Sequence, residues 1–445
     1  MALKPLDIFK HLPKTNCKEC GFPTCLAFAM QVALGKTELA NCTQLSEESK
    51  KRLSQASSPP IRTITLGSEK SKVNLGGETV MFRHEKTFYN PPPIGILLSE
   101  GLSDEEIDRR LEKFCSLIYE RVGLTLQGEV IAVEDKGQGR FLATVKKAFN
   151  TGKCLLLISP EAENLIKAAE ICQGTKPLLF LAGQVPTEKL AQVAKATSLP
   201  IVVSSNTLEG IAKMTAVLSD QGVTDLVIYP EVNSVGTLLK NLVLIRRAAI
   251  HGGVRQLGYP VLAMPARLTD DLLTQTMYAC LAIAKYASLV ILSDLSGEIL
   301  FPLLLERLNL FTDPQRPLAT VQGLYEIGQP GRDAPLLVTS NFSLTYFIVS
   351  GEIQNSRVPA YLLVVDTEGL SVLTAWAADK LNAEKIATLV KQTKIEEKID
   401  HRTLILPGVV AGIAGELEEE LPGWKILLGP REAAYIPVFL KNWKP

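Results

Sequence analysis

The sequence predicts a multidomain α/β protein with a small N-terminal cysteine-rich domain, a central (β/α)8 TIM barrel and a C-terminal open, Rossmann-like α/β domain. Three observations lead to this prediction. The chain has 445 residues, more than the roughly 250–300 that one hydrophobic core usually supports. Four of its eight cysteines fall within the first 42 residues. Short apolar runs then alternate with segments of helical period in two series, which DPQRP at 313–317 separates.

The charge balance and the apolar runs exclude several classes of partner. Lysine plus arginine and aspartate plus glutamate each number 47. A neutral chain lacks the basic field that would attract nucleic acid or an anionic membrane. The N-terminal MALKPLDIFKHLPKTN has no continuous apolar segment like that of a signal peptide, and no apolar run reaches the ~18 residues of a membrane-spanning helix. We expect a soluble, cytoplasmic protein that binds neither nucleic acid nor membrane.

The N-terminal cysteines have the spacing of an iron–sulfur site. Residues 17–25 read CKECGFPTC and a fourth cysteine follows in NCTQ, so the pattern is C-x2-C-x4-C-x16-C. Zinc sites usually offer two separated pairs of ligands. Three bunched cysteines with a remote fourth are more typical of a [4Fe–4S] cluster, where a tight loop holds three irons and a distant residue reaches the last. Zinc and unligated thiols are the alternatives. The predicted ligands are Cys17, Cys20, Cys25 and Cys42.

The residues around these ligands agree with a closed set of four thiolates. Gly21, directly after the second ligand, would let backbone amides approach the sulfides of the cluster. We expect His11 on the surface, because four cysteines already complete the set. The remaining cysteines stand singly in apolar stretches, and we expect them to be small core residues because free cysteine is commonly buried. They are Cys115, Cys154, Cys172 and Cys280.

The cysteine-rich domain is predicted over residues 1–57 and a connector over 58–93. The domain ends in the polar, helix-like LSEESKKRLSQ, and SSPP opens the connector. Within the connector, IRTITLG and ETVMFRHEKTF alternate as strands do, with the glycine pair at 76–77 as their hairpin turn. A connector of this kind would let the first domain move.

The barrel is predicted over residues 94–320. Eight short runs are apolar throughout, as in strands buried on both faces of a parallel sheet. Each precedes a segment of helical period, the first of which is DEEIDRRLEKFCSLIYERV. Eight strand–helix units in this length match a (β/α)8 barrel, and an open doubly wound sheet is the alternative. The runs lie at 94–99, 129–134, 155–159, 178–183, 201–205, 226–230, 261–265 and 289–294.

The C-terminal domain is predicted over residues 321–445, with strands at 334–340, 360–367, 402–408 and 424–430. In such a fold ligands bind at the carboxyl ends of the strands. These ends are neutral and rich in hydroxyls and glycines, which suit a large, amide-bearing ligand better than a polyphosphate. The alternative is that the hydroxyls only cap the following helices, as Ser340 or Asn341 could do. The candidates are Thr339, Ser340, Ser343, Thr345, Tyr346, Gly369, Ser371, Thr374, Gly408 and Gly429.

Other catalytic signatures are weak or absent. GVVAGIAG at 408–415 does not have the glycine spacing of a dinucleotide-binding loop, and close packing of a helix on the sheet explains it as well. The sequence holds no Walker, H-E-x-x-H or G-x-S-x-G motif. His251, beside glycines in a barrel loop, could be catalytic or structural. A catalytic barrel could use acids at its βα loops, although each is as easily a solvated loop residue. Those acids are Glu134, Asp135, Asp294 and Glu298.

The order of a CKECGFPTC cluster, a barrel and a small α/β domain resembles the large (gamma) subunit of the corrinoid/iron–sulfur protein of the acetyl-CoA (Wood–Ljungdahl) pathway. The resemblance covers essentially all 445 residues, and the strand ends TSNFSLTYF and EGLSVLTAW support it. It implies a [4Fe–4S] cluster on the four cysteines and a cobamide on the C-terminal domain. The cobamide contacts that it implies are Ser340, Tyr346, Leu370, Ser371, Val372, Leu373 and Ala433.

The function that this resemblance implies is corrinoid-dependent methyl transfer. Cobalt would receive a methyl group from methyltetrahydrofolate, delivered by a separate methyltransferase, and pass it to acetyl-CoA synthase. The [4Fe–4S] cluster would return Co(II) to Co(I), and a small subunit would complete a heterodimer. The chain lacks the D-x-H-x-x-G motif of many cobamide proteins, since DHRTL at 400–404 has neither its spacing nor its glycine. A cobamide would therefore be held without a histidine lower ligand.

A second class of function stays open at this stage. The chain could be an iron–sulfur electron-transfer protein whose barrel is itself catalytic, for example as a folate-type methyltransferase. A third reading makes the barrel a scaffold that docks partners, which agrees with the carrier hypothesis. Whether the chain is an enzyme in its own right is not decided by these patterns.

Overall fold

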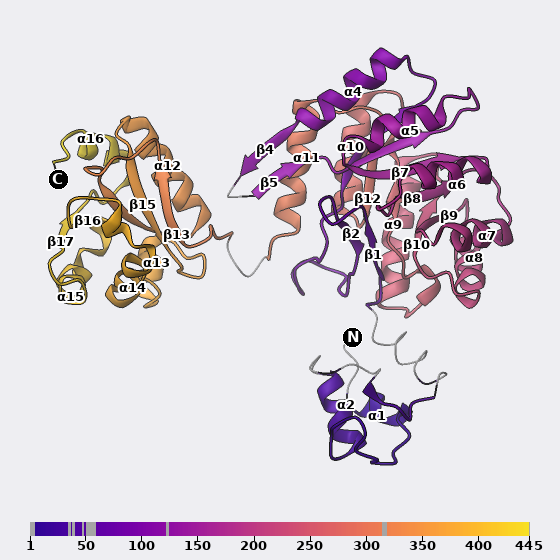
Figure 1. Cartoon of the computed structure of the whole chain (residues 1–445), viewed down its shortest axis with the longest axis horizontal. Coiled ribbons are helices and arrows are strands. Elements are labelled where there is room, and N and C mark those ends of the chain that lie inside the picture. Colours follow the sequence, from indigo (N-terminus) through magenta and orange to yellow (C-terminus); the bar gives the residue numbers. More distant parts are fainter. Residues whose placement is uncertain are drawn as a thin grey trace. The chain divides into compact units, whose positions relative to one another are not determined.

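The structure is a computed structural model of the whole chain, and it describes residues 5–33, 37, 41–46, 49, 59–121, 124–313 and 318–444 (Figure 1). The chain divides into two compact units, Met1–Ile118 with Gln127–Phe311, and Tyr119–Leu126 with Thr312–Pro445. The finer boundaries at 57, 93 and 320 stay a prediction. No helix in the described ranges is long and apolar enough to cross a bilayer.

The N-terminal segment is built from two short helices, α1 (Pro5–His11) and α2 (Cys25–Ala33). They pack through Ile8, Phe28 and Ala29, and the buried Cys25 and Cys42 belong to the same small apolar cluster. Its core is too small to hold much structure by burial alone, which is typical of domains that a metal group completes. The predicted polar helix LSEESKKRLSQ lies largely outside the described residues.

Eight parallel strands form the barrel, in the order β10-β9-β8-β7-β6-β3-β12-β11. The ring closes between its last members, where Ile228 of β10 bridges Val261 and its N–H donates to the Pro260 carbonyl at 2.9 Å. The predicted (β/α)8 barrel is therefore confirmed, and the open doubly wound sheet is wrong for this region. The strands are β3 (Ile94–Ser99), β6 (Val130–Glu134), β7 (Cys154–Ser159), β8 (Leu178–Leu181), β9 (Ile201–Ser205), β10 (Leu226–Pro230), β11 (Leu262–Ala263) and β12 (Leu289–Leu292).

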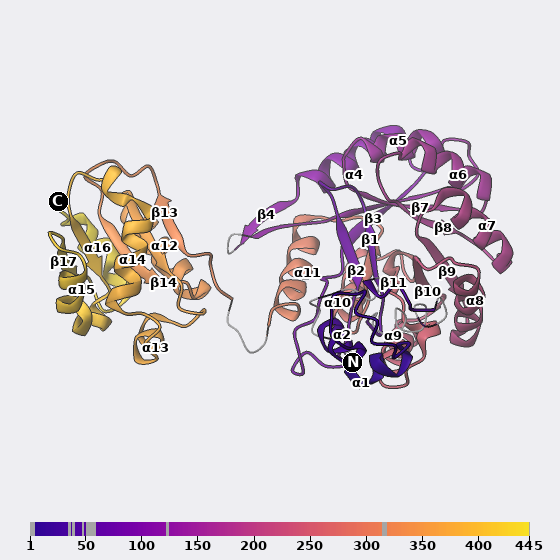
Figure 2. The same ribbon diagram turned by 60° about the horizontal axis from the view of Figure 1, so that its bottom comes forward.

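Helices surround the strands (Figure 2). Four of these helices have a capping side chain that accepts a hydrogen bond from the backbone N–H three residues later. This bond satisfies a donor that the first turn of a helix leaves unpaired. The capping residues are Ser103, Thr207, Ser234 and Asp271. The helices are α4 (Asp104–Ser116), α5 (Phe141–Phe149), α6 (Ala162–Ile171), α7 (Thr187–Thr197), α8 (Leu208–Asp220), α9 (Val235–Ile250), α10 (Leu272–Ala284) and α11 (Gly297–Leu310), with short 3-10 turns η2 (Arg255–Leu257) and η3 (Pro265–Arg267).

The first predicted barrel helix is shorter than expected. It ends at Ser116, and the following residues form a hairpin of β4 (Ile118–Arg121) and β5 (Leu124–Gln127). Ile118 and Tyr119 are β-branched and aromatic residues that favour a strand. The sequence pattern did not separate them from the helix because their apolar spacing continues it.

The connector forms a hairpin that covers the amino-terminal end of the barrel. Strands β1 (Thr63–Leu66) and β2 (Val73–Gly76) pair antiparallel, and Gly67 bridges Lys176, which precedes β8. The predicted first strand is correct, but the second lies before the glycine pair rather than after it. Gly76 and Gly77 have φ of 74° and 79° and end β2 instead of joining two strands. Residues 78–93 form no strand.

The C-terminal sheet has the order β13-β15-β14-β16-β17, with β13 antiparallel and the rest parallel. Helices cover both faces, because the buried residues divide into one apolar cluster with α14 and another with α12 and α16. The four predicted strands are present, and β13 was missed. The strands are β13 (Gly323–Ile327), β14 (Leu336–Ser340), β15 (Ala360–Val365), β16 (Thr403–Leu406) and β17 (Lys425–Leu428).

The segment after β15 forms two helices. The break falls at 378–382, where Asp379 has φ of 55°. The helices of this unit are α12 (Ser343–Ser356), α13 (Val372–Ala377), α14 (Ala383–Thr393), α15 (Ala414–Glu420) and α16 (Ile436–Lys441), with 3-10 turns η4 (Ile395–Glu397), η5 (Gly408–Ile413) and η6 (Ala433–Tyr435).

Two of the four cysteines expected in the core are fully buried there. Burial raises the pKa of the Cys154 thiol to about 12 and that of Cys172 to about 11, so neither is a reactive thiolate. Cys115 and Cys280 are only half-buried, which corrects the prediction for these two.

Candidate functional site

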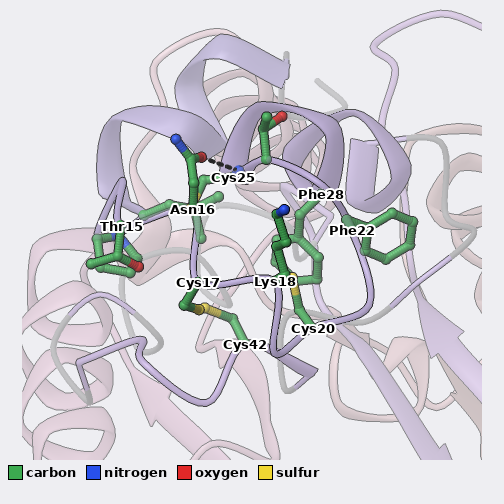
Figure 3. A pocket seen from close by; sticks show the side chains of 12 residues that line it. Thr15, Asn16, Cys17, Lys18, Cys20, Phe22, Cys25, Phe28 and Cys42 are labelled. Atoms are coloured by element: carbon green, nitrogen blue, oxygen red, sulfur yellow. Dashed lines mark hydrogen bonds between the residues drawn. The ribbon is translucent and has the colours of Figure 1, made fainter.

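The four N-terminal cysteines converge on one pocket (Figure 3). Cys25 is the first residue of α2, and its backbone N–H donates to Asn16 Oδ1 at 2.8 Å. The Thr24 hydroxyl accepts from the Ala27 N–H at 3.1 Å and caps the same helix. Cys25 and Cys42 are buried, whereas Cys17 is exposed. The predicted ligand set is thus brought together by the fold, although its ligand role remains a prediction.

Glu19 brings the remote cysteine to the loop. It lies between Cys17 and Cys20, and its carboxylate accepts hydrogen bonds from the Thr43 hydroxyl and from Gln44 Nε2, the latter at 3.1 Å. These bonds, Thr43 first, lower the pKa of Glu19, so it stays ionised. Both donors directly follow Cys42. We call these two hydrogen bonds the Glu19 latch. No local sequence pattern indicated it, because its partners are 24 and 25 residues from Glu19 and all are polar.

The chemistry of the pocket fits a thiolate-bound anionic cluster. The described residues that line it contribute no carboxylate or imidazole. Burial, followed by the charges of the three neighbouring thiolates, raises the pKa of Cys42. No three acidic, imidazole or thiol side chains among the described residues are placed to hold a single metal ion. A cubane makes a different demand, because each thiolate binds its own iron.

The backbone of the loop supplies a second sign of an anion site. The dihedral φ alternates in sign from Lys14 to Lys18, with 59°, 50° and 66° at Lys14, Asn16 and Lys18. Gly21 has φ of 80°, and its N–H donates to the Lys18 carbonyl at 3.0 Å. A loop in which the sign of φ alternates can gather neighbouring N–H groups into a concavity that binds anions such as iron–sulfur clusters, and the φ values here are compatible with such a loop.

A cavity of about 270 Å³ lies at the carboxyl ends of the C-terminal strands. It is bounded by the ends of β14, β16 and β17 and by the start of α13. Arg431 is the one charged residue in its described lining. Half of the predicted cofactor residues line it, namely Thr339, Thr345, Ser371, Val372, Leu373, Gly429 and Ala433. Sequence reasoning missed the apolar lining, including Leu337, Val349, Ile405, Leu406, Pro407, Val409 and Ile436, because it looked for hydroxyls and glycines.

The other predicted residues are near this edge but not in the lining. Tyr346 packs against Tyr325, with ring centroids 5.0 Å apart. A Cβ at Gly408 would stand 2.5 Å from the Gly429 carbonyl, so that glycine allows two strand-end loops to approach. The remaining five are Ser340, Ser343, Gly369, Leu370 and Thr374. Gly369 and Leu370 belong to the loop after β15, and Thr374 belongs to α13.

Buried hydroxyls at this edge have no hydrogen-bond partner among the residues that the structure describes. They belong to Thr339, Ser340 and Ser343, and to Thr320 on the segment that pairs with them. A buried hydroxyl left unbonded costs about 1–3 kcal/mol. The alternative role as helix caps is wrong for α12, whose N-cap residue is Phe342 and which has no side-chain cap. Of these residues Thr339 lines the cavity, so its hydroxyl is available there to a ligand with amide groups.

Large apolar side chains are also exposed on the helices at this edge. Seven apolar or aromatic side chains are between 38% and 63% exposed. They lie on α12, on α13, on α16 and on the turn directly before α16. Exposed apolar side chains on neighbouring helices are typical of a binding surface. The residues are Leu344, Phe347, Ile348, Leu373, Trp376, Tyr435 and Val438.

The histidine of this unit is engaged at the opposite edge of the sheet. His401 Nε2 is 2.9 Å from the Ala334 carbonyl, and Nδ1 accepts from the Thr403 N–H at 3.2 Å. Its ring packs on Trp443. Ala334 and Thr403 lie at the amino-terminal ends of their strands, so both ring nitrogens of His401 are occupied away from the cavity.

The acids at the barrel's βα loops are occupied by partners. Glu134 pairs with Arg267 and Lys136 at 2.9 Å each. Asp135 accepts from the Ser159 hydroxyl at 2.6 Å and from Asn164 at 2.8 Å. Burial would raise the pKa of Asp135, but these bonds outweigh it and lower the pKa.

The remaining barrel candidates are paired, exposed or distant from the βα loops. Asp294 pairs with Lys113 at 3.2 Å, and Glu298 is a solvent-exposed residue in the first turn of α11. His251 ends α9 and therefore lies at the opposite end of the barrel from the βα loops. Sequence reasoning missed Glu100, a fully buried carboxylate that accepts three backbone N–H bonds at 2.6–2.8 Å and shapes the loop after β6.

Comparison with known proteins covers the whole chain. Residues 63–440 match a family described as "CO dehydrogenase/acetyl-CoA synthase delta subunit", and residues 12–44 match one described as "Putative Fe-S cluster". The chain is 40% identical over 446 residues to the corrinoid/iron-sulfur protein large subunit of Moorella thermoacetica, with 99% of each chain covered. It is 32% identical to the acetyl-CoA decarbonylase/synthase complex subunit gamma of Methanothermobacter thermautotrophicus, again with 99% of each covered.

Solved structures with similar folds match only part of the chain, and distantly. A dihydropteroate synthase from Thermus thermophilus is 15% identical, with a TM-score of 0.40, 56% of this chain covered and 99% of that one.

Proposed function

Because this chain belongs to the family of corrinoid/iron–sulfur protein large subunits, we propose that it carries methyl groups in the acetyl-CoA pathway on a bound corrinoid. The observation that carries the proposal is the strand-end cavity of the C-terminal unit. It is almost uncharged, adjoins buried hydroxyls without partners and is flanked by exposed apolar helices. A wide, apolar macrocycle with amide side chains needs a surface of this composition.

The chain's own residues would bind and orient the cofactor. Hydroxyls of Thr339, Ser340 and Ser343 would bond its amides, while Val372, Leu373 and neighbouring apolar residues would exclude water from its face. Because His401 is held at the far edge, we propose that no histidine of this unit serves as lower ligand. When bound, a corrinoid supplies a metal that accepts and donates a methyl group, at a potential that its axial ligation tunes.

We further propose that Cys17, Cys20, Cys25 and Cys42 hold a [4Fe–4S] cluster that supplies single electrons to reactivate the corrinoid. The convergence of four thiols on one pocket and the alternating backbone around them support this role. Such a protein would act in the cytoplasm, where thiols stay reduced.

Three partners follow from the proposed function. A small subunit would complete a heterodimer, a methyltransferase would deliver the methyl group from methyltetrahydrofolate, and acetyl-CoA synthase would receive it. The names of the two relatives, a "large subunit" and a subunit of a decarbonylase/synthase complex, support assemblies of this kind. The occupied acids of the barrel support a carrier rather than a catalytic barrel.

Metal analysis of the protein purified without oxygen tests the proposal. We expect about four irons and one cobalt per chain, with the visible absorption of a corrinoid. Iron without cobalt would overturn the carrier function in favour of electron transfer. Zinc in place of iron would overturn the cluster.

A further inference from the structure

Asn341, the residue that follows β14, is the centre of the hydrogen bonds that shape the neighbouring strand-end loop. Its Oδ1 accepts from the N–H of Thr367 and of Gly369, each at 3.0 Å, and from the Thr367 hydroxyl at 2.9 Å. Its Nδ2 donates to Asp366 Oδ1 at 2.9 Å. The side chain is 4% exposed, so it reaches its partners within the protein.

The loop needs these bonds because its own geometry is unfavourable. The Leu370 N–H donates to the Thr367 carbonyl at 3.2 Å, which makes residues 367–370 a tight turn. Its central residues, Glu368 and Gly369, have φ of 58° and 76°. A glutamate in the left-handed region is uncommon and persists where the surroundings hold it. Asp366 Oδ1 also accepts from the Glu368 N–H at 3.0 Å, so the Asn341–Asp366 pair holds both ends of the turn.

The backbone of Asn341 fixes this centre to the sheet. Its N–H donates to the Val365 carbonyl at 2.9 Å, and its carbonyl accepts from the Thr320 N–H at 2.8 Å. The turn that it holds continues directly into Ser371, Val372 and Leu373, which line the cavity. Asn341 itself is not in the described lining, so it acts on the cavity only through the loop.

We propose that Asn341 is a positioning residue, whose carboxamide fixes the 366–370 turn so that 371–373 present a preformed wall to the corrinoid. This inference rests on the proposed function of the C-terminal unit. A wall that is already ordered spares the cofactor the cost of ordering it, which raises affinity.

The variant Asn341→Asp tests this role with little change in shape. It keeps one acceptor oxygen but puts a carboxylate oxygen opposite Asp366 in place of the Nδ2 donor. We expect the Thr367 and Gly369 amides of the full-length, corrinoid-free protein to exchange hydrogen about tenfold faster. We also expect less corrinoid, measured by visible absorbance, to be retained through gel filtration. Asn355→Asp, the same change at an exposed position near the end of α12, should alter neither result.

A second substitution distinguishes positioning from general damage to the core. In the double variant Asn341→Asp with Asp366→Asn, the amide at position 366 can donate to the carboxylate at position 341, but the Glu368 N–H loses the oxygen that accepted both bonds. The double variant should therefore slow the Thr367 and Gly369 exchange again and recover part of the corrinoid retention. Three outcomes would overturn the role of Asn341 but not the proposed function. They are unchanged hydrogen exchange in the single variant, unchanged corrinoid retention despite faster exchange, and no recovery in the double variant. A wild-type protein that binds no corrinoid would overturn the proposed function and this role with it.

Discussion

Arg246 and Glu78 form a 3.1 Å ion pair in which both side chains are almost completely buried, with 3% and 7% of their surfaces exposed. Arg246 comes from barrel helix α9 and Glu78 from the connector. The Glu78 carboxylate also accepts from the Tyr89 N–H at 2.8 Å, while Arg246 Nε donates to the Val80 carbonyl at 3.0 Å. The pair therefore locks the connector onto the barrel wall.

Arg246→Met should destabilise the barrel by roughly 3–5 kcal/mol, because it leaves a buried carboxylate without its partner. The urea midpoint of the barrel transition measures this loss. Arg109→Met, which removes an exposed arginine paired with Glu106, should change the midpoint little. Equal shifts in the two variants would contradict the buried-pair argument.

The loss in Arg246→Met should depend on pH. Burial raises the pKa of Glu78 above its usual value even though Arg246 opposes the shift. Without Arg246 the pKa rises further, so the carboxyl is neutral in the folded variant at low pH and must ionise as the pH rises. The penalty relative to wild type should therefore be complete at pH 8 and shrink at pH 5, as urea unfolding at both values would reveal. A constant difference would argue against a charged Glu78.

Cys20→Ala should remove the iron of the N-terminal segment while corrinoid stays bound to the C-terminal unit, because no residue is shared by the two sites. Iron and cobalt analysis of the anaerobically purified variant measures this separation. Methyl transfer from already reduced corrinoid should persist, and reductive reactivation should be lost. Cys172→Ala, a change of the same type in the barrel core, should keep its iron. Loss of both metals from Cys20→Ala would mean that the cluster is structural.

The barrel could be predicted because parallel strands are buried on both faces and so appear as uninterrupted apolar runs. Strand β13 does not appear as such a run, since its sequence GLYEI forms a half-exposed edge strand that begins with glycine. The expectation that ligands bind at the carboxyl ends of the strands identified Thr339 and Ser371 as cavity residues. Asn341 was considered only as a helix cap. Its role depends on a loop 25 residues later, a pairing that no local pattern encodes. The Glu19 latch was missed for the same reason.

Glu19→Gln should weaken the hold on the segment that carries Cys42, because a neutral amide accepts hydrogen bonds from Thr43 and Gln44 less strongly than a carboxylate. We expect the iron to be lost to a chelator several-fold faster than from wild type, as the decay of cluster absorbance would show. Glu112→Gln, the same change at an exposed position of α4, is the matched control. If both proteins lose iron at the wild-type rate, the latch does not hold the fourth ligand.

Thr339→Val should have opposite effects on stability and on cofactor binding. The Thr339 hydroxyl is buried without a partner, so replacing it with a methyl group of similar shape should stabilise the corrinoid-free protein by about 1–3 kcal/mol. If the hydroxyl instead serves the cofactor, the same change should weaken corrinoid retention.

Thr215→Val gives the contrast that makes this prediction decisive. That hydroxyl is equally buried but donates to the Gln256 carbonyl at 2.6 Å, so its loss should destabilise the barrel and leave corrinoid retention unchanged. Thermal unfolding of corrinoid-free protein and titration with corrinoid measure the two effects separately. A Thr339→Val protein that is destabilised like Thr215→Val would show that the hydroxyl has an internal partner. One that binds corrinoid as wild type does would exclude Thr339 from the contacts, because a buried hydroxyl that serves the cofactor cannot be removed without cost to binding.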